Sequence, residues 1–147
     1  MKVKLDPGAY MPERAHEYDA GLDLRSTICQ TVPARGSAIF DTGVHIQLPH
    51  GTFGDVRPKS GLNFKYDIVC EKERISEAMM TDGTIDEPYT GSIQVKLYNL
   101  GDTDYDVERG DKICQLVIVP VIYVVPELVT ELEQTDRGDN GFGSTGK

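Results

Sequence analysis

Two short segments carry residue types that can bind phosphate and activate water. Residues 57–62 read Arg-Pro-Lys-Ser-Gly-Leu, and they combine cationic side chains, a hydroxyl and a glycine amide, which are groups that chelate phosphate oxygens. Residues 83–91 place Asp86 and Tyr89 close together, so that a proton-accepting carboxylate can lie beside an aromatic platform. The residue types alone favour an ordinary surface turn in both places.

Asp23 is a third candidate because it stands alone among apolar neighbours. If residues 20–24 form a strand, Leu22 and Leu24 face the core and Asp23 points to the opposite side. There the carboxylate either faces solvent, which is the commoner situation, or faces a cation.

The last eleven residues, 137–147, differ in kind from the rest of the chain. They read Arg-Gly-Asp-Asn-Gly-Phe-Gly-Ser-Thr-Gly-Lys, with four glycines and one large apolar residue, and such a segment cannot build a core. Residues 141–147 fit the start of a GxxxxGK loop, but the sequence shows neither the Ser or Thr nor the helix that such a loop needs after the lysine, so we expect no true phosphate-binding loop here. The segment is therefore either a disordered tail or an arm that orders over a flat, phosphorylated ligand.

The composition is that of one acidic globular domain. The chain has 147 residues, 39% of them hydrophobic, with 24 acidic and 15 basic residues and a net charge of −9. This length supports a single hydrophobic core. The excess of acid argues against a broad nucleic-acid or anionic-membrane surface, since such a surface needs concentrated positive charge. Any phosphate must therefore be held locally.

The sequence also predicts a cytoplasmic protein without a structural metal or disulfide framework. The N-terminus lacks the apolar stretch of a signal peptide, and the longest apolar run, 116–125, is short and interrupted by Pro120. The three cysteines are far apart with no CxxC pair, and the three histidines lack the spacing of a helical metal pair.

Alternation of apolar and polar residues dominates the chain and predicts an all-β sandwich or barrel. Only two short segments have helical periodicity, residues 71–80 and 127–134, and residues 83–91 have the glycines and proline of a hairpin. Strands are expected at 3–5, 44–48, 93–97, 113–119 and 121–125, the last two joined at Pro120, with turns at 33–36, 48–51, 99–102 and 108–111.

Five segments, taken in order, resemble the motifs of the trimeric dUTPases, the deoxyuridine triphosphate hydrolases. Their agreement in register along nearly the whole chain is far more specific than any one of them. The segments are AGLDLRS (20–26), RPKSGL (57–62), GTIDEPYTG (83–91), RGDKICQL (109–116) and RGDNGFGSTGK (137–147).

This resemblance implies a fold and an activity. The expected fold is an all-β jelly roll or distorted β-barrel over residues 1–136, with residues 137–147 forming a glycine-rich C-terminal arm. The expected assembly is a homotrimer with sites at subunit junctions, each closed by an arm. The expected reaction is the Mg²⁺-dependent hydrolysis of dUTP to dUMP and pyrophosphate.

The resemblance also assigns roles to residues. Asp86 is expected to orient and activate the water that attacks the α-phosphorus, and Tyr89 to pack under the deoxyribose and exclude a 2′-hydroxyl. Asp23 is expected to hold the metal indirectly, through water. Substrate contacts are expected from Lys59, Ser60, Gly61 and Gln115 to the phosphates, from the backbone of Gly83, Thr84 and Ile85 to uracil, from Phe142 stacking on uracil, and from Arg137, Gly143, Ser144 and Thr145 on the arm.

Three departures from the family pattern stand out. Lys59 occupies a position where arginine is usual, which loses the bidentate fork of a guanidinium. Met80 occupies the place of an asparagine that helps to bind the base, and methionine cannot make those hydrogen bonds. Residues 63–82 form a longer stretch than is common and are a candidate contact for a regulatory protein partner.

Two other functions stay open at this point. A deoxycytidine triphosphate deaminase shares the fold and the phosphate grip, but it replaces an exocyclic amine, and the combination of Asp86, Tyr89 and the Phe142 arm favours phosphate hydrolysis. A nucleotide-sensing β domain that binds a partner is the second alternative, and an intact Asp86 argues against a purely binding role.

Overall fold

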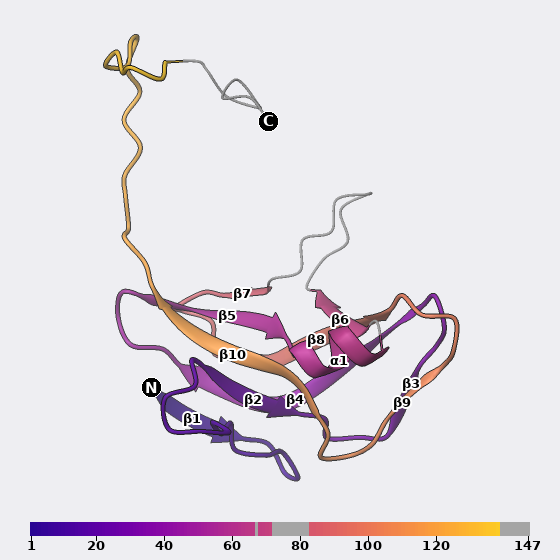
Figure 1. Ribbon diagram of the computed structural model, residues 1–147. Helices are drawn as coiled ribbons and strands as arrows, with labels where there is room; N and C mark the ends of the chain where they lie inside the picture. The colour runs from indigo at the N-terminus through magenta and orange to yellow at the C-terminus, as the bar shows by residue number, and fades with distance from the viewer. Residues whose placement is uncertain (67, 72–82, 139–147) are drawn as a thin grey trace.

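The computed structural model describes residues 1–66, 68–71 and 83–138, which form two packed antiparallel sheets and a small ribbon (Figure 1). The sheets have the strand orders β1-β4-β8-β6 and β2-β10-β5-β7, and β3 pairs with β9. The elements are β1 (Lys2–Leu5), β2 (Gly21–Arg25), β3 (Gln30–Val32), β4 (Ser37–Gln47), β5 (Thr52–Pro58), α1 (Ser60–Tyr66), β6 (Ile68–Glu71), β7 (Gly83–Ile85), β8 (Ser92–Asn99), β9 (Tyr105–Val107) and β10 (Lys112–Pro120).

The core lies between the inner faces of the two sheets, and alternation along the strands builds it. In β4 and β8, every second residue is buried, as the sequence pattern predicts. The side chains at its centre are less than 2% exposed and include Phe40, Ile93 and Leu97 from one sheet and Leu24 and Leu116 from the other. The all-β prediction is confirmed, and the arrangement is of the jelly-roll type.

The outer face of the sheet β2-β10-β5-β7 carries polar residues from all four strands, and three of the predicted site residues, Asp23, Gln115 and Thr84, are among them. Strand register places Gln115 beside Asp23 on one side and beside Arg57 on the other. Asp55 lies two residues from Arg57 on the same strand and opposite Thr84 of β7. One face of a sheet thus gathers residues that are far apart in the sequence.

The predicted turns at 33–36, 48–51 and 108–111 are confirmed as turns between strands. Gly51 and Gly110 have φ angles of 78° and 94°, values that L side chains rarely adopt. The hairpin predicted for residues 83–91 is wrong, because β7 pairs with β5 whereas β8 pairs with β4 and β6. The connection crosses from one sheet to the other, and this leaves the Asp86 turn at a rim of the sandwich.

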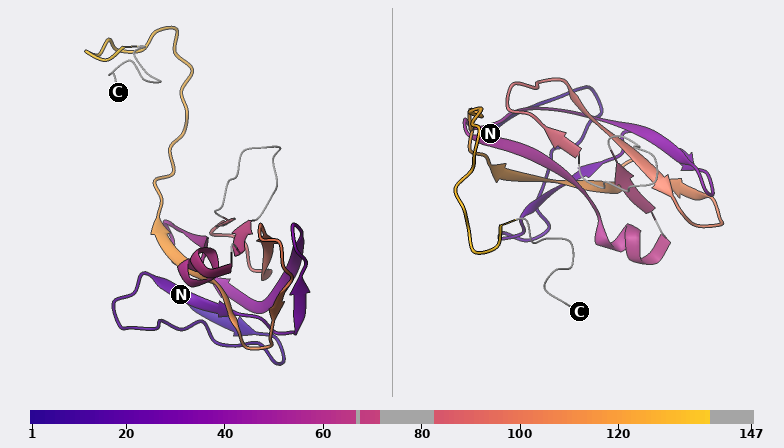
Figure 2. Two further views of the ribbon diagram at one scale, coloured as in Figure 1. Left: turned by 45° about the vertical axis from the view of Figure 1, so that its right-hand side comes forward. Right: turned by 90° about the horizontal axis from the view of Figure 1, so that it is seen from above.

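Two other predicted elements are wrong. Residues 121–125 continue from β10 without pairing with a described strand, and residues 127–134 are not helical. Figures 1 and 2 show this segment leaving the body of the molecule after β10. Its exposed apolar side chains, including Val125 at 92% and Leu128 at 100% exposure, are not part of this chain's own hydrophobic core.

Helix α1 was not predicted, and the helix predicted at residues 71–80 lies outside the described residues beyond Glu71, which ends β6. Among residues 1–66, 68–71 and 83–138, no helix is long and apolar enough to cross a membrane.

Candidate active site

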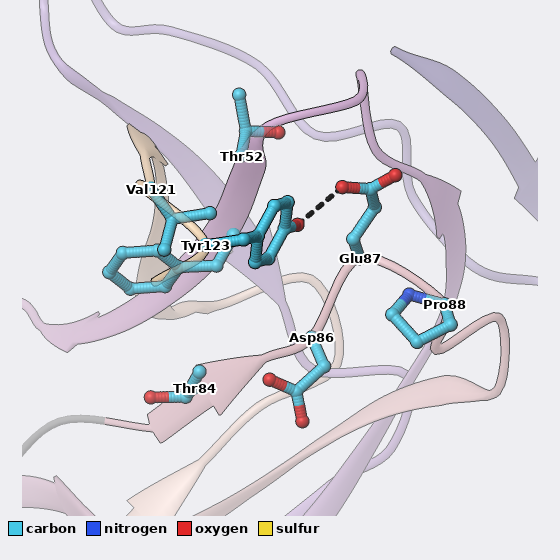
Figure 3. Close-up of a pocket in the computed structure, with 8 residues that line it drawn as sticks. Thr52, Thr84, Asp86, Glu87, Pro88, Val121 and Tyr123 are labelled. Atoms are coloured by element: carbon cyan, nitrogen blue, oxygen red, sulfur yellow. Dashed lines mark hydrogen bonds between the residues drawn. The ribbon is translucent and has the colours of Figure 1, made fainter. Parts of the chain in front are cut away.

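A cavity of about 490 Å³ opens beside the Asp86 turn (Figure 3). Its volume falls in the range of small-molecule sites. Its walls come from the start of β5, the end of β7 with the turn that follows, and the segment after β10. The lining residues are Thr52, Phe53, Thr84, Asp86, Glu87, Pro88, Val121 and Tyr123.

Asp86 is held in this cavity by the strand before it and by its own turn. Ile85, the last residue of β7, is 5% exposed in the core, so it fixes the point from which the turn begins. The Tyr89 N–H donates to the Asp86 carbonyl at 2.9 Å and closes the turn. The Asp86 side chain is exposed to the cavity, where it can meet a ligand or a water molecule.

Strand β7 forms an edge of its sheet in the described part of the chain, because it pairs only with β5. On its other side, β7 has no partner among the described strands. Backbone N–H and C=O groups on such an edge are obligatory donors and acceptors that can pair with a ligand.

Glu87, next to Asp86, is the most heavily hydrogen-bonded side chain of the cavity. Its carboxylate accepts from His50 Nδ1 at 2.9 Å, from the Gly51 N–H at 3.0 Å and from the Tyr123 hydroxyl at 2.5 Å. The hydrogen bonds from Tyr123, His50 and Gly51 lower the pKa of Glu87 to about 2. Glu87 is therefore a carboxylate at neutral pH.

Tyr89 turns away from the cavity in this chain. Its hydroxyl donates to the Ser92 carbonyl at 2.9 Å, and its ring lies over Gly91. A Cβ at Gly91 would come within 2.4 Å of the tyrosine hydroxyl, so the glycine permits this close approach. Tyr89 is 44% exposed, which leaves part of the ring open to a ligand.

A second polar cluster joins Asp23 to two lysines. Asp23 is 7% exposed, and its two oxygens accept from Lys59 Nζ at 2.8 Å and from Lys112 Nζ at 2.6 Å. Burial alone would raise the pKa of Asp23, but the hydrogen bonds from Lys112 and Lys59 hold it below its usual value. Of the two readings of Asp23, the solvent-facing one is wrong, since cations cover the carboxylate.

Lys112 is a contact that the sequence pattern did not predict. Strict alternation from Cys114 would point Lys112 into the core, but the register of β10 shifts between Lys112 and Cys114. This bulge lets Ile113 and Cys114 both be buried while Lys112 joins Asp23 on the outer face. Lys112 belongs to the fourth motif, which is the only signal that pointed to it.

The remaining phosphate-binding candidates border this cluster. Gln115 donates through Nε2 to the Pro58 carbonyl at 3.2 Å, directly before Lys59. Ser60 and Gly61 begin α1 and are exposed, and a Cβ at Gly61 would meet open space. Gly21 allows Gln115 to lie against β2, since a Cβ there would come within 2.2 Å of Oε1.

The two clusters are separate within one chain. None of Lys59, Ser60, Gln115 and Asp23 lines the Asp86 cavity. Arg137 is exposed near the end of the described residues. The predicted site residues Met80, Phe142, Gly143, Ser144 and Thr145 lie outside the described residues.

The described part of the chain contains no group of three or more His, Cys, Asp or Glu residues that could hold a metal ion directly. Asp23 nevertheless has the chemistry of an indirect metal ligand. The carboxylate is ionised, and each oxygen accepts one lysine hydrogen bond and keeps a lone pair for the water of a hydrated ion.

Sequence reasoning missed His50, Glu87 and Tyr123 as members of a site. Glu87 lies within the third motif, but the family resemblance assigns it no role, and Tyr123 falls in the segment 121–125 for which the sequence predicts a strand. The residues are brought together by the crossover between the sheets, and no local pattern contains this information.

Comparisons with known proteins identify the family. The dUTPase family model matches residues 8–146. A deoxyuridine 5′-triphosphate nucleotidohydrolase of Clostridium acetobutylicum is 46% identical over 143 residues, which cover 97% of this chain and 93% of that protein. Its counterpart in Gloeothece citriformis is 43% identical over 144 residues, covering 98% and 94%.

Solved structures agree. A mutant dUTPase of Staphylococcus bacteriophage 80alpha with dUpNHpp superposes with a TM-score of 0.83 at 30% identity, covering 99% of this chain and 98% of that one. A mutant dUTPase of S. aureus phage phi11, described with a structural Mg(II) ion, gives a TM-score of 0.78 at 28% identity, covering 90% and 98%. The resemblance drawn from the five motifs is confirmed: this chain belongs to the dUTPase family.

Proposed function

We propose that this protein hydrolyses dUTP to dUMP and pyrophosphate, with Asp86 as the general base. The observation that carries the proposal is the Asp86 carboxylate, exposed in a cavity of about 490 Å³ at the end of β7, which is an edge strand in the described part of the chain. Curated relatives over nearly the full length are nucleotidohydrolases by name. The proposed general base, Asp86, thus lies beside the backbone of β7, which we propose pairs with uracil.

In the proposed reaction, Asp86 accepts a hydrogen bond from a water molecule and takes its proton as the water attacks. A bond forms between the water oxygen and the α-phosphorus. The bond between the α-phosphorus and the oxygen bridging to the β-phosphorus breaks, and its electron pair leaves with pyrophosphate. Holding the water in line is the larger part of the task, because positioning converts a bimolecular step into a nearly unimolecular one.

Lys59, Ser60, Gly61 and Gln115 form the proposed phosphate grip. Lys59 pairs with Asp23, so its charge is already placed at the cluster. Lys112 holds the second oxygen of Asp23 and can keep that carboxylate paired when Lys59 turns toward phosphate. On the arm, Arg137, Ser144 and Thr145 are proposed to contact the terminal phosphate, and Phe142 and Gly143 to cover uracil.

Asp23 is the proposed anchor for Mg²⁺, which it would hold through water. When bound, the ion would neutralise charge on the triphosphate and on the departing pyrophosphate. Its preference for keeping its water ligands suits a carboxylate that already has two lysine partners.

We infer a homotrimer in which each site is shared between chains. Two features of the single chain support this: the Asp86 cavity and the Lys59 cluster are separate, and residues 122–132 expose several large apolar side chains outside the core. Residues 1–136 are the proposed β domain, and residues 137–147 are the arm that closes over a site. Cytoplasmic location stays a prediction from the sequence.

Residues 63–82 are the proposed contact for a regulatory protein partner. In the described part of this stretch, Phe64 is 87% exposed and Tyr66 is 50% exposed on α1. Residues 72–82, including Met80, lie outside the described residues.

A panel of nucleotides with Mg²⁺ tests the proposed activity. Release of pyrophosphate is expected from dUTP at a kcat/KM at least 100-fold above that for dCTP, dTTP and UTP. Cytosine would leave polar groups of a uracil-pairing site unpaired. The 5-methyl group of dTTP and the 2′-hydroxyl of UTP would instead be excluded by lack of space, the latter against Tyr89. Ammonia is measured in the same reactions. Its release from dCTP would show a deaminase, and tight dUTP binding without any product would show a sensing domain.

A further inference from the structure

Three segments distant in sequence meet at one carboxylate, that of Glu87. They are the turn between β4 and β5, the turn that carries Asp86, and the segment that follows β10. Besides the three hydrogen bonds to Glu87, the Val121 N–H donates to the Gly51 carbonyl at 2.9 Å. The rings of His50 and Tyr123 also lie 5.9 Å apart between centroids. The three segments are therefore joined by several hydrogen bonds and a ring contact, and not by a single surface ion pair.

The charges in this set are consistent with each other. Glu87 is ionised, so it can only accept, and His50 must carry its proton on Nδ1 to donate. The hydrogen bond to Glu87 raises the pKa of Tyr123, and the nearby charge of Asp86 adds to this effect. Among the described residues, His50 and Tyr123 are the ionisable groups that hydrogen-bond to Glu87, the charge of Asp86 acts on Tyr123, and the tyrosine stays protonated across the neutral range.

The side chains of Glu87 and Asp86 point in different directions. Figure 3 shows the Glu87 carboxylate turned toward Tyr123 and the Asp86 carboxylate turned away from it. Asp86 and Glu87 are the first two residues of the turn that the Tyr89 N–H closes on the Asp86 carbonyl, so their backbone conformations are coupled. Fixing the Glu87 side chain therefore fixes which way Asp86 points.

We propose that Glu87 is a positioning residue, which ties the Asp86 turn to Gly51 and Tyr123 and so sets the direction of the Asp86 carboxylate in the cavity. The inference rests on the proposed role of Asp86 in dUTP hydrolysis. The inference adds that Tyr123 acts through Glu87. The start of the segment after β10 is thereby coupled to Asp86, the proposed general base.

Glu87→Gln tests the positioning role. The amide keeps one acceptor but presents an NH₂ group to the donors of the cluster, so the turn loosens. We expect kcat for dUTP to fall about tenfold with KM within about twofold, since small displacements of a positioned group cost much in rate. The control is Glu17→Gln, which removes the same charge from an exposed position outside the proposed site and the proposed subunit contact. It should leave kcat unchanged.

A double-mutant cycle separates coupling from independent effects. Tyr123→Phe removes one of three donors, and we expect a fall of about threefold in kcat. The double variant with Glu87→Gln should be no slower than Glu87→Gln alone, within about twofold. Independent contributions would instead multiply to about thirtyfold, and this result would contradict action through Glu87. Tyr18→Phe is the matched control, because Tyr18 is 90% exposed.

A measurement without substrate keeps the inference separate from the proposed function. The ultraviolet titration of the protein minus that of Tyr123→Phe isolates the ionisation of Tyr123. In the Glu87→Gln background, we expect this ionisation to move to lower pH, toward the ordinary tyrosine pKa near 10.

The outcomes are distinguishable. A shifted titration together with unchanged kcat would overturn the positioning role while leaving the contact intact. An unshifted titration would overturn the contact itself. If the wild-type protein hydrolyses no dUTP, the proposed function fails, and the titration still reports on the Glu87 cluster. Thermal unfolding of each variant should stay within a few degrees of wild type, because the cluster lies at the surface; a general loss of folded protein would contradict a local role.

Discussion

Asp86→Asn is expected to lower kcat for dUTP hydrolysis by about 10²- to 10⁴-fold, the range that general acid–base catalysis supplies. Asparagine has the shape of aspartate but cannot take a proton from water. The side chain is exposed in its cavity and its turn is closed by the backbone, so the fold should survive the change. Single-turnover kinetics with saturating enzyme would measure the chemical step separately from binding.

Asp102→Asn is the matched control. Asp102 pairs with Arg35 at 2.8 Å on the surface, with side chains 83% and 67% exposed, and such a pair contributes little. We expect wild-type kcat from this variant. A kcat for Asp86→Asn within tenfold of wild type would mean that another group takes the proton.

Removal of residues 137–147 is expected to reduce kcat/KM on the order of 100-fold while leaving the proposed trimer assembled, since the proposed closure of the arm over a ligand would position the reacting groups. The core of the described residues lies between β1 and the end of β10 in the sequence, and the Gly138 N–H donates locally, to the carbonyl and the hydroxyl of Thr135. Steady-state pyrophosphate release measures the loss, and sedimentation measures the assembly.

Two outcomes would contradict this account of the arm. Unfolding or dissociation of the truncated chain would show that the arm is structural. Wild-type turnover would show that it does not cover the site. A shorter truncation that removes only residues 146–147 keeps Phe142, Ser144 and Thr145 and should retain most of the activity.

The sandwich could be predicted from the sequence because its strands bury one face. The alternation in β4 and β8 reports directly on a core to which the same chain contributes both sides. Pro120 likewise ends β10, because a proline cannot donate to the ladder. Local pattern and tertiary burial agree at these positions.

The segment after β10 shows where such reasoning fails. Residues 121–125 are apolar enough to predict a strand, and Leu128 and Leu132 have helical spacing, yet these side chains are exposed. An apolar sequence pattern indicates that side chains are buried, but it does not indicate whether the same chain or another chain buries them. The false hairpin at residues 83–91 has a related cause, because turn residues do not reveal which sheet each flanking strand joins.

The candidate site likewise contains residues that the sequence predicts and residues that it does not. Family motifs indicated Asp86, Lys59 and Gln115, and the structure places them at the rim and on the polar face of one sheet. Lys112 and the partners of Glu87 were not predictable, since one depends on a β-bulge and the others on a crossover between sheets. A sequence motif can therefore indicate the residues that are proposed to act on substrate. The residues that hold them in place depend on contacts that form only in the folded chain.

Hydrolysis of dUTP in ¹⁸O-labelled water, with Mg²⁺ and wild-type protein, tests the central claim most directly. Water activated by Asp86 is proposed to attack the α-phosphorus, so one labelled oxygen should appear in dUMP and none in pyrophosphate, as mass spectrometry of both products would show. Label in pyrophosphate would place the attack at the β-phosphorus and contradict the account.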